Sequence, residues 1–262
     1  MDLPAGLWHL GAVLTRLLDA VVFSSLWLAA AAAVLVAASS RALGAPVDPA
    51  SAALAACGTL VVYNVDRLRD IRRDHVTAPE RTRFVQTHRR ALVALTVLAG
   101  VGSAALAARL GRGAALLLAV VLAVGLLHRR LKRAAFIKPL YVTAAWLAVV
   151  VGLPWYTAPQ PLHTGWVLAS LGCALLANAI ASNLRDEAGA ARIGRVRALR
   201  VARGASLVGS VAALSGPPEV RALSAVPLAT LAVLLPFHPS ERFGLVALDG
   251  ALLAGALLAL AL

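Results

Sequence analysis

The most constraining feature of the sequence is a succession of long apolar segments separated by short loops rich in arginine. Of the 262 residues, 60% are hydrophobic and only 14% are charged, a balance typical of membrane proteins. A transmembrane helix needs about 20 largely apolar residues, and a shorter segment suffices where neighbouring helices compensate. Nine segments fit this pattern: 20–39, 49–65, 91–109, 113–128, 139–157, 163–182, 200–215, 220–236 and 244–262.

These segments predict one all-α domain over residues 1–262, a polytopic bundle of about nine transmembrane helices. No polar stretch is long enough for a separate soluble domain. Alanine, leucine and scattered glycines dominate the segments, and small side chains let helices approach closely in lipid. The apolar run after Arg16 is long for the core of a signal peptide, so we expect it to be retained as a span.

The basic residues predict the orientation of the bundle. If all nine segments span, 21 of the 25 Lys and Arg residues fall on one side and four on the other, at Arg41, Arg109, Arg112 and Arg221. Cytoplasmic loops carry the excess of Lys and Arg, so we expect the N-terminus and the three basic loops in the cytoplasm and the C-terminus outside. This arrangement suits a bacterial-type cytoplasmic membrane. It also accounts for the net charge of +13 without a nucleic-acid partner.

Acidic residues gather on the same side, at the ends of two spans. The stretch YNVDRLRDIRRD carries Asp66, Asp70 and Asp74, and the stretch ASNLRDEAGAARIG carries Asp186 and Glu187. If the helix continues past Tyr63, the three aspartates of the first stretch share one face, because each step of four residues is about one helical turn. Carboxylates so placed suit Mg²⁺, which is typically shared with substrate phosphate oxygens.

A plainer interpretation of Asp66 and Asp70 is a solvated helix end. Arginines lie three positions from each of them, and such exposed pairs contribute only tenths of a kcal/mol. Asp74 and Asp186 differ, because no basic residue lies three or four positions away from either. An ionisable residue at a span end without a local partner is a functional candidate. The two clusters would then face each other across a cavity.

These motifs resemble those of the UbiA superfamily of intramembrane prenyltransferases. That family carries aspartate motifs in the cytoplasmic loops after spans two and six. The stretch LHRRLKRAAFIKPLYVTAAWLAVVVGLP (127–154) also looks like the family's lysine-containing loop and the span that follows it. The resemblance covers most of the chain.

Two departures from the family pattern leave alternatives open. The family's first aspartate pair could be Asp66 with Asp70 or Asp70 with Asp74. In the second motif Asp186 matches, but the last aspartate of the pattern falls at Ala190, which cannot bind a metal. The second metal position therefore lacks a ligand unless Glu187 substitutes for it.

The resemblance implies transfer of a prenyl group from an isoprenyl diphosphate to a lipophilic, aromatic acceptor, with Mg²⁺ as cofactor and membrane lipids around the site. It assigns catalysis to Asp66, Asp70 and Asp186; metal binding to Asp66, Asp70, Asp74, Asp186 and Glu187; and substrate binding to Tyr63, Asn64, Arg67, Arg130, Lys132 and Asn183. Two alternatives remain: an intramembrane terpene cyclase of the same superfamily, and a non-catalytic lipid-binding protein that retains the fold. The prenyl length, the acceptor and the oligomeric state are left open.

Overall fold

The computed structural model describes residues 5–131, 137–158, 162–184 and 194–262, and these residues form helices joined by short turns, with no strand among them. The helices, in chain order, are α1 (Ala5–Phe23), α2 (Leu26–Ala42), α3 (Pro49–Arg69), α4 (Ile71–Thr77), α5 (Pro79–Thr87), α6 (Arg89–Leu110), α7 (Arg112–Leu131), α8 (Ile137–Val150), α9 (Gly152–Thr157), α10 (Thr164–Asn183), α12 (Arg195–Ser215), α13 (Pro218–Arg221), η1 (Ala222–Ser224), α14 (Ala225–Leu234), η2 (Phe243–Leu248) and α15 (Asp249–Ala261). The all-α prediction is therefore confirmed for the described chain.

Among the described residues, four helical segments are long enough and apolar enough to cross a membrane. They are Arg89–Leu110, Lys138–Thr157, Thr164–Asn183 and Phe243–Ala261, and the bent pair α1–α2 makes a fifth if it counts as one span. The other expected spans also lie on helices, but these are shorter or carry charges near one end, as α3 does with Asp66, Arg67 and Arg69. The described chain thus has several helices that could span a membrane.

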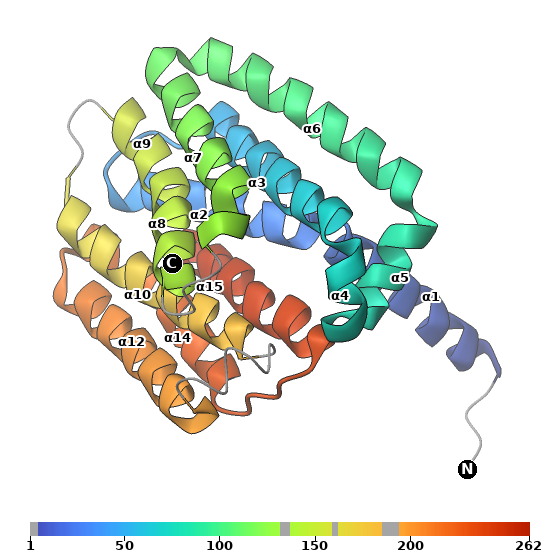
Figure 1. The fold of residues 1–262 in the computed structure, drawn as a ribbon. Coiled ribbons are helices and arrows are strands. Elements are labelled where there is room, and N and C mark those ends of the chain that lie inside the picture. The colour runs from blue at the N-terminus through green and yellow to red at the C-terminus, as the bar shows by residue number, and fades with distance from the viewer. Residues whose placement is uncertain (1–4, 132–136, 159–161, 185–193) are drawn as a thin grey trace.

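The helix α2 lies at the centre of the bundle, packed between α3 and α15 (Figure 1). Its buried face consists mainly of alanines around Leu35 and Val36. Small side chains on this face allow the neighbouring helices to come close, and the same hydrophobic core continues through α8, α10 and α12. In Figure 1, α3 and α10 run toward the same end of the bundle, and α15 begins between their ends.

The first expected span, 20–39, is not one straight helix. It breaks at Ser24 and Ser25, and the helices on either side differ in direction by 63°. Ser25 has a left-handed backbone (φ 66°), which interrupts the helix and bends the chain. The straight helix begins at Leu26, and α1 leaves the bundle toward the N-terminus (Figure 1).

Candidate functional site

The three aspartates of the first motif follow one another by single turns of helical backbone. The helix α3 continues past Tyr63 to Arg69, as expected, and then bends at Asp70. The helical hydrogen bonds nevertheless run through the bend, because the amide of Asp70 donates to the carbonyl of Asp66 (2.9 Å) and the amide of Asp74 donates to that of Asp70 (2.9 Å). We call Asp66, Asp70 and Asp74 the aspartate ladder.

The middle residue of the aspartate ladder is buried inside the protein. Asp70 is buried, with 3% of its surface exposed, and Asp66 is half-buried. Both have interaction partners within the molecule. A buried carboxylate stays charged only if it is paired or hydrogen-bonded, so this end of α3 is more than a solvated helix end.

Asp74 has a partner that lies beyond the range of local helix pairs. Its carboxylate accepts a hydrogen bond from Arg81 Nη2 at 2.6 Å, and both side chains are largely covered. The chain turns at Ala78 between α4 and α5, which brings Arg81 back over Asp74. Pro79 begins helix α5, in the first helical position, which proline tolerates.

Two residues far along the sequence, Glu241 and Arg242, hold helix α5 in place. The carboxylate of Glu241 accepts hydrogen bonds from the amides of Glu80 (3.2 Å) and Arg81 (3.0 Å), which are free donors at the N-terminus of α5. Arg242 donates to Glu80 (2.7 Å) and to Asp19 of α1 (3.1 Å). The hydrogen bond to Glu80, with the charge of Asp19 beside it, raises the pKa of Arg242 above its usual value. The segment that bears Arg81 is thereby fixed to α1 and to the residues just before η2.

Asn64 and Arg67 hold the joint between α1 and α2. Ser25 Oγ donates to Asn64 Oδ1 at 2.8 Å inside the protein. The guanidinium of Arg67 is buried and donates to the carbonyls of Val22 and Phe23, the last turn of α1. A cation is favourable at a helix C-terminus, where carbonyls lack intrahelical partners. These two residues therefore position the ladder, and Arg67 is committed to backbone rather than free to meet a substrate.

An aromatic pair and a fourth carboxylate lie one turn above the ladder. Trp146 Nε1 donates to the hydroxyl of Tyr63 at 3.0 Å, and the two rings meet edge to face with centroids 6.5 Å apart. The charges of Asp66 and of Asp249 both lie within electrostatic range of the Tyr63 hydroxyl. Helix α15 thus brings Asp249 to the interior near α3.

The end of α10 approaches the same region. Asn178 Nδ2 donates to the carbonyl of Leu248 at 2.9 Å, beside Asp249, and Ser182 Oγ reaches Asn178 Oδ1 at 3.5 Å. Asn183, a predicted substrate-binding residue, is half-buried at the last position of α10. The ends of α3 and α10 are therefore linked through the start of α15.

Several predicted site residues lie outside the described residues. These are Lys132, Asp186 and Glu187, together with Ala190 of the second motif, while Arg130 belongs to α7 with its side chain outside the described part. Their roles remain predictions.

Within the described residues, no group of three or more His, Cys, Asp or Glu side chains forms a ready-made metal cage. The donor chemistry of the ladder still fits Mg²⁺, which usually takes one or two protein carboxylates and completes its coordination with water and substrate phosphate oxygens. Asp66 and Asp70, one turn apart at the end of α3, offer such a pair.

Comparison with known proteins found no matching family model, no matching curated protein and no matching solved structure.

Two residues near the site were missed from the sequence. Asp249 was given no role from the sequence, although its charge lies within electrostatic range of the Tyr63 hydroxyl. It is in the first turn of α15. The expected span 244–262 starts on the side of the basic loops, so a count of helical turns from residue 244 would have placed this carboxylate within two turns of that side. Arg81 was missed because its partner is seven residues away, across a turn that no helical spacing predicts.

Proposed function

We propose that this chain is an intramembrane prenyltransferase that moves a prenyl group from an isoprenyl diphosphate to a lipophilic, aromatic acceptor, with Mg²⁺ as cofactor. The observation that carries the proposal is the aspartate ladder at the end of an apolar helix, with Asp70 buried and an aromatic pair one turn deeper. Ionisable residues at the edge of a membrane core are expensive to keep, so they favour a functional site.

The proposal includes the nine-span topology of the UbiA superfamily. Each of the nine apolar segments falls on helix, and the basic loops then share the cytoplasmic side with the ladder. Helix α1, bent away from α2, would lie along that membrane surface and expose Val13, Leu14 and Leu17 to it.

Asp66, Asp70 and, across the site, Asp186 would hold Mg²⁺ against the diphosphate of the donor. When bound, the metal supplies Lewis-acid stabilisation of the departing diphosphate. Asn64 and Arg67 position this end of α3 by fixing it to the α1–α2 joint. Lys132 and Arg130 are the proposed cationic residues that face the diphosphate, and Glu187 is the proposed substitute for the ligand missing at Ala190.

The interior above the ladder suits a reactive allylic cation. Tyr63 and Trp146 present aromatic faces there, and such faces attract cations through their ring quadrupole. The apolar walls of α2, α3 and α8 exclude water, which would otherwise quench the cation. The carboxylates of Asp66 and Asp249 lie near enough to add a favourable negative potential.

The test is to incubate purified protein with geranyl, farnesyl and geranylgeranyl diphosphates and Mg²⁺, and to measure pyrophosphate release with and without membrane-derived aromatic acceptors. Release that depends on an acceptor supports prenyl transfer. Release with a cyclic hydrocarbon product would instead identify a terpene cyclase. Diphosphate binding without release would leave a lipid-binding protein of the same fold, an outcome that Ala190 favours.

A further inference from the structure

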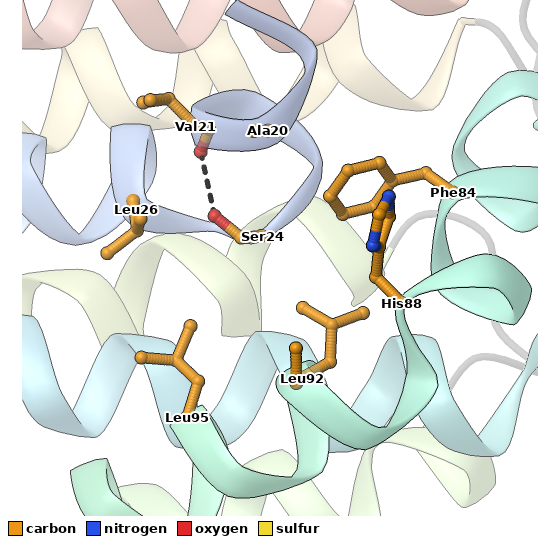
Figure 2. A pocket seen from close by; sticks show the side chains of 9 residues that line it. Ala20, Val21, Ser24, Leu26, Phe84, His88, Leu92 and Leu95 are labelled. Atoms are coloured by element: carbon orange, nitrogen blue, oxygen red, sulfur yellow. Dashed lines mark hydrogen bonds between the residues drawn. The ribbon is translucent and has the colours of Figure 1, made fainter. Parts of the chain in front are cut away.

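An apolar groove lies beside the α1–α2 joint (Figure 2). Its volume is about 280 Å³, and it is formed by the end of α1, the start of α2, the end of α5 and the first two turns of α6. The lining residues are Ala20, Val21, Ser24, Leu26, Phe84, His88, Ala91, Leu92 and Leu95.

The lining offers hydrocarbon almost throughout. Leu26 of α2 faces Leu92 and Leu95 of α6 in Figure 2. The hydroxyl of Ser24 is turned back onto the carbonyl of Val21 (3.3 Å). The rings of Phe84 and His88 pack together with centroids 4.5 Å apart, and the histidine is exposed at the rim. Such a lining binds an apolar chain and gives a polar molecule no partner.

The surface around the groove is also apolar and faces outward. Leu26 is 43% exposed, and α6, one of the helices able to cross a membrane, also exposes Val93, Val97 and Leu98. An exposed apolar surface of this extent is stable only against lipid or another protein. The groove therefore opens onto the bilayer.

The size of the groove limits its occupant. Pockets that enclose a small molecule typically measure roughly 300–1,000 Å³. At about 280 Å³ the groove holds part of one hydrocarbon chain and leaves the rest of a lipid outside.

Charge at the rim selects the headgroup. Arg89 and Arg90 follow His88 directly, are exposed, and occupy the first turn of α6. Cations in that turn oppose the helix dipole, and an anion placed there would relieve the repulsion. Arg16, one turn before Ala20 on α1, adds a third exposed cation to this end of the molecule.

We propose that this groove binds one acyl chain of an acidic phospholipid, with the headgroup beside His88, Arg89 and Arg90. The site is separate from the aspartate ladder and does not depend on the proposed reaction. Two of its walls are nevertheless connected to the ladder. Ser24 directly precedes Ser25, which donates to Asn64, and Phe84 lies on α5 together with Arg81, which donates to Asp74. A bound lipid would brace both the α1–α2 joint and the helix that holds Asp74.

The experiment uses the full-length protein in nanodiscs of phosphatidylcholine that contain a trace of phosphatidylglycerol with a photoactivatable group on its acyl chain. We expect crosslinks in the wild type to map to the lining residues of α1 and α6. Ala91→Phe fills the groove and should reduce these crosslinks at least fivefold. The control Ala94→Phe, exposed on the same helix but outside the lining, should leave them unchanged.

The headgroup is tested with the double variant Arg89→Gln/Arg90→Gln, which should abolish the preference for phosphatidylglycerol over an equally labelled phosphatidylcholine. Arg112→Gln, an exposed arginine at the opposite end of the bundle, is the control. Crosslinks spread evenly over α6, or equal labelling by both lipids in the wild type, would overturn the proposal. So would displacement of the probe by farnesyl diphosphate but not by excess phosphatidylglycerol, which would make the groove a prenyl site. Because the wild-type crosslink map alone decides between these outcomes, the test holds even if one variant fails to fold.

Discussion

Asp70 is the residue on which the proposed site depends most. It is 3% exposed and lies where α3 ends and α4 begins, so its carboxylate has little water to stabilise its charge. Its backbone amide and carbonyl continue the helical hydrogen bonds from Asp66 to Asp74. A residue that served only to mark the end of α3 would not need to be both acidic and buried.

We predict that Asp70→Asn and Asp186→Ala each remove Mg²⁺-dependent binding of isoprenyl diphosphate, because each deletes a proposed metal ligand. Binding is measured by titration calorimetry with a non-hydrolysable diphosphate analogue, with and without Mg²⁺. Asp48→Asn, at the other end of α3, is the control and should bind normally. Unchanged affinity in both site variants would return these aspartates to a structural role.

The sequence predicted the spacing of the ladder but not the residues that position it. Spacing of four residues was enough to place Asp66, Asp70 and Asp74 one turn apart. Asn64 and Arg67 could not be assigned, because their partners lie about 40 residues earlier at a bend that has no sequence signature beyond two serines. The substrate-binding roles expected for them followed from the resemblance to the UbiA superfamily.

At the level of the helices, arginines that were read as topology signals also cap helix ends. Arg67 donates to the last turn of α1, Arg203 donates to the carbonyls of Leu234 (2.9 Å) and Leu235 (3.1 Å) after α14, and Arg41 donates to Leu260 near the end of α15 (2.6 Å). In each case the cation satisfies carbonyls that have no partner in their own helix. Charge placement in this chain therefore serves packing as well as orientation.

The start of α3 is capped by Asp48, and its contribution depends on pH. Partial burial alone would raise the pKa of Asp48, but the hydrogen bonds from the Ser51 hydroxyl and from the amides of Ala50 and Ser51 outweigh it and lower the pKa. A lowered pKa in the folded state stabilises the protein above the unfolded value of about 3.9, and this stabilisation is lost as the pH falls through the folded value.

We predict that Asp48→Ala lowers the free energy of unfolding by about 1 kcal/mol at pH 7, and that its difference from wild type shrinks below about pH 4. Thermal melting in detergent at pH 7, 5 and 3 measures this. Asp48→Asn keeps a capping oxygen without the charge, so we expect a smaller loss at pH 7 that also shrinks as the wild-type carboxylate becomes protonated. A loss from Asp48→Ala that persists undiminished at pH 3 would contradict the assignment.

The helices α10 and α12 meet closely at Gly209. A Cβ atom there would lie 2.8 Å from the carbonyl oxygen of Ser170 and 2.9 Å from Cys173 Cβ, both on α10. At Gly204, five residues earlier on α12, a Cβ atom would meet nothing within 4 Å. The two glycines thus differ in packing but share a helix.

We predict that Gly209→Ala destabilises the protein by about 1–3 kcal/mol through overpacking, whereas Gly204→Ala is neutral or stabilising by up to about 1 kcal/mol through helix propensity. Melting temperatures of the two variants in the same detergent give the comparison. Equal effects would mean that α10 and α12 do not pack at this contact.

Element boundaries were predictable where hydrophobicity changes and not where the backbone bends. The apolar segments 91–109 and 163–182 correspond within a few residues to α6 and α10. The break at Ser24–Ser25 was missed because apolar residues continue on both sides of it, so a hydropathy pattern contains no signal.

At the scale of the whole molecule, the end of α1 and the segment before the last helix meet at the side of the ladder. Glu241 caps α5, and Arg242 joins Glu80 to Asp19 of α1. These contacts place the start of the last span beside the end of α1 and the α3–α5 segment. If the chain crosses the membrane at each of the nine segments, this side is cytoplasmic and the far end of α15 is outside.

An odd number of spans puts the α4 segment and the last residue on opposite sides of the membrane, and that consequence can be measured directly. Val76 in α4 is 85% exposed and Leu262 is 76% exposed, so a cysteine at either position is accessible. In a background with Cys57 and Cys173 changed to alanine, we expect a membrane-impermeant maleimide to label Leu262→Cys but not Val76→Cys in intact cells. Permeabilised cells should show both labelled, which controls for reactivity.

The labelling pattern also tests the orientation and whether the number of crossings is odd. Labelling of neither position in intact cells would place both inside, which requires an even number of crossings between them and contradicts the nine-span arrangement. Labelling of Val76→Cys alone would invert the bundle and put the ladder outside. Labelling of Leu262→Cys alone joins a cytoplasmic ladder, where isoprenyl diphosphates are accessible, to an outer C-terminus, as nine spans with basic cytoplasmic loops require.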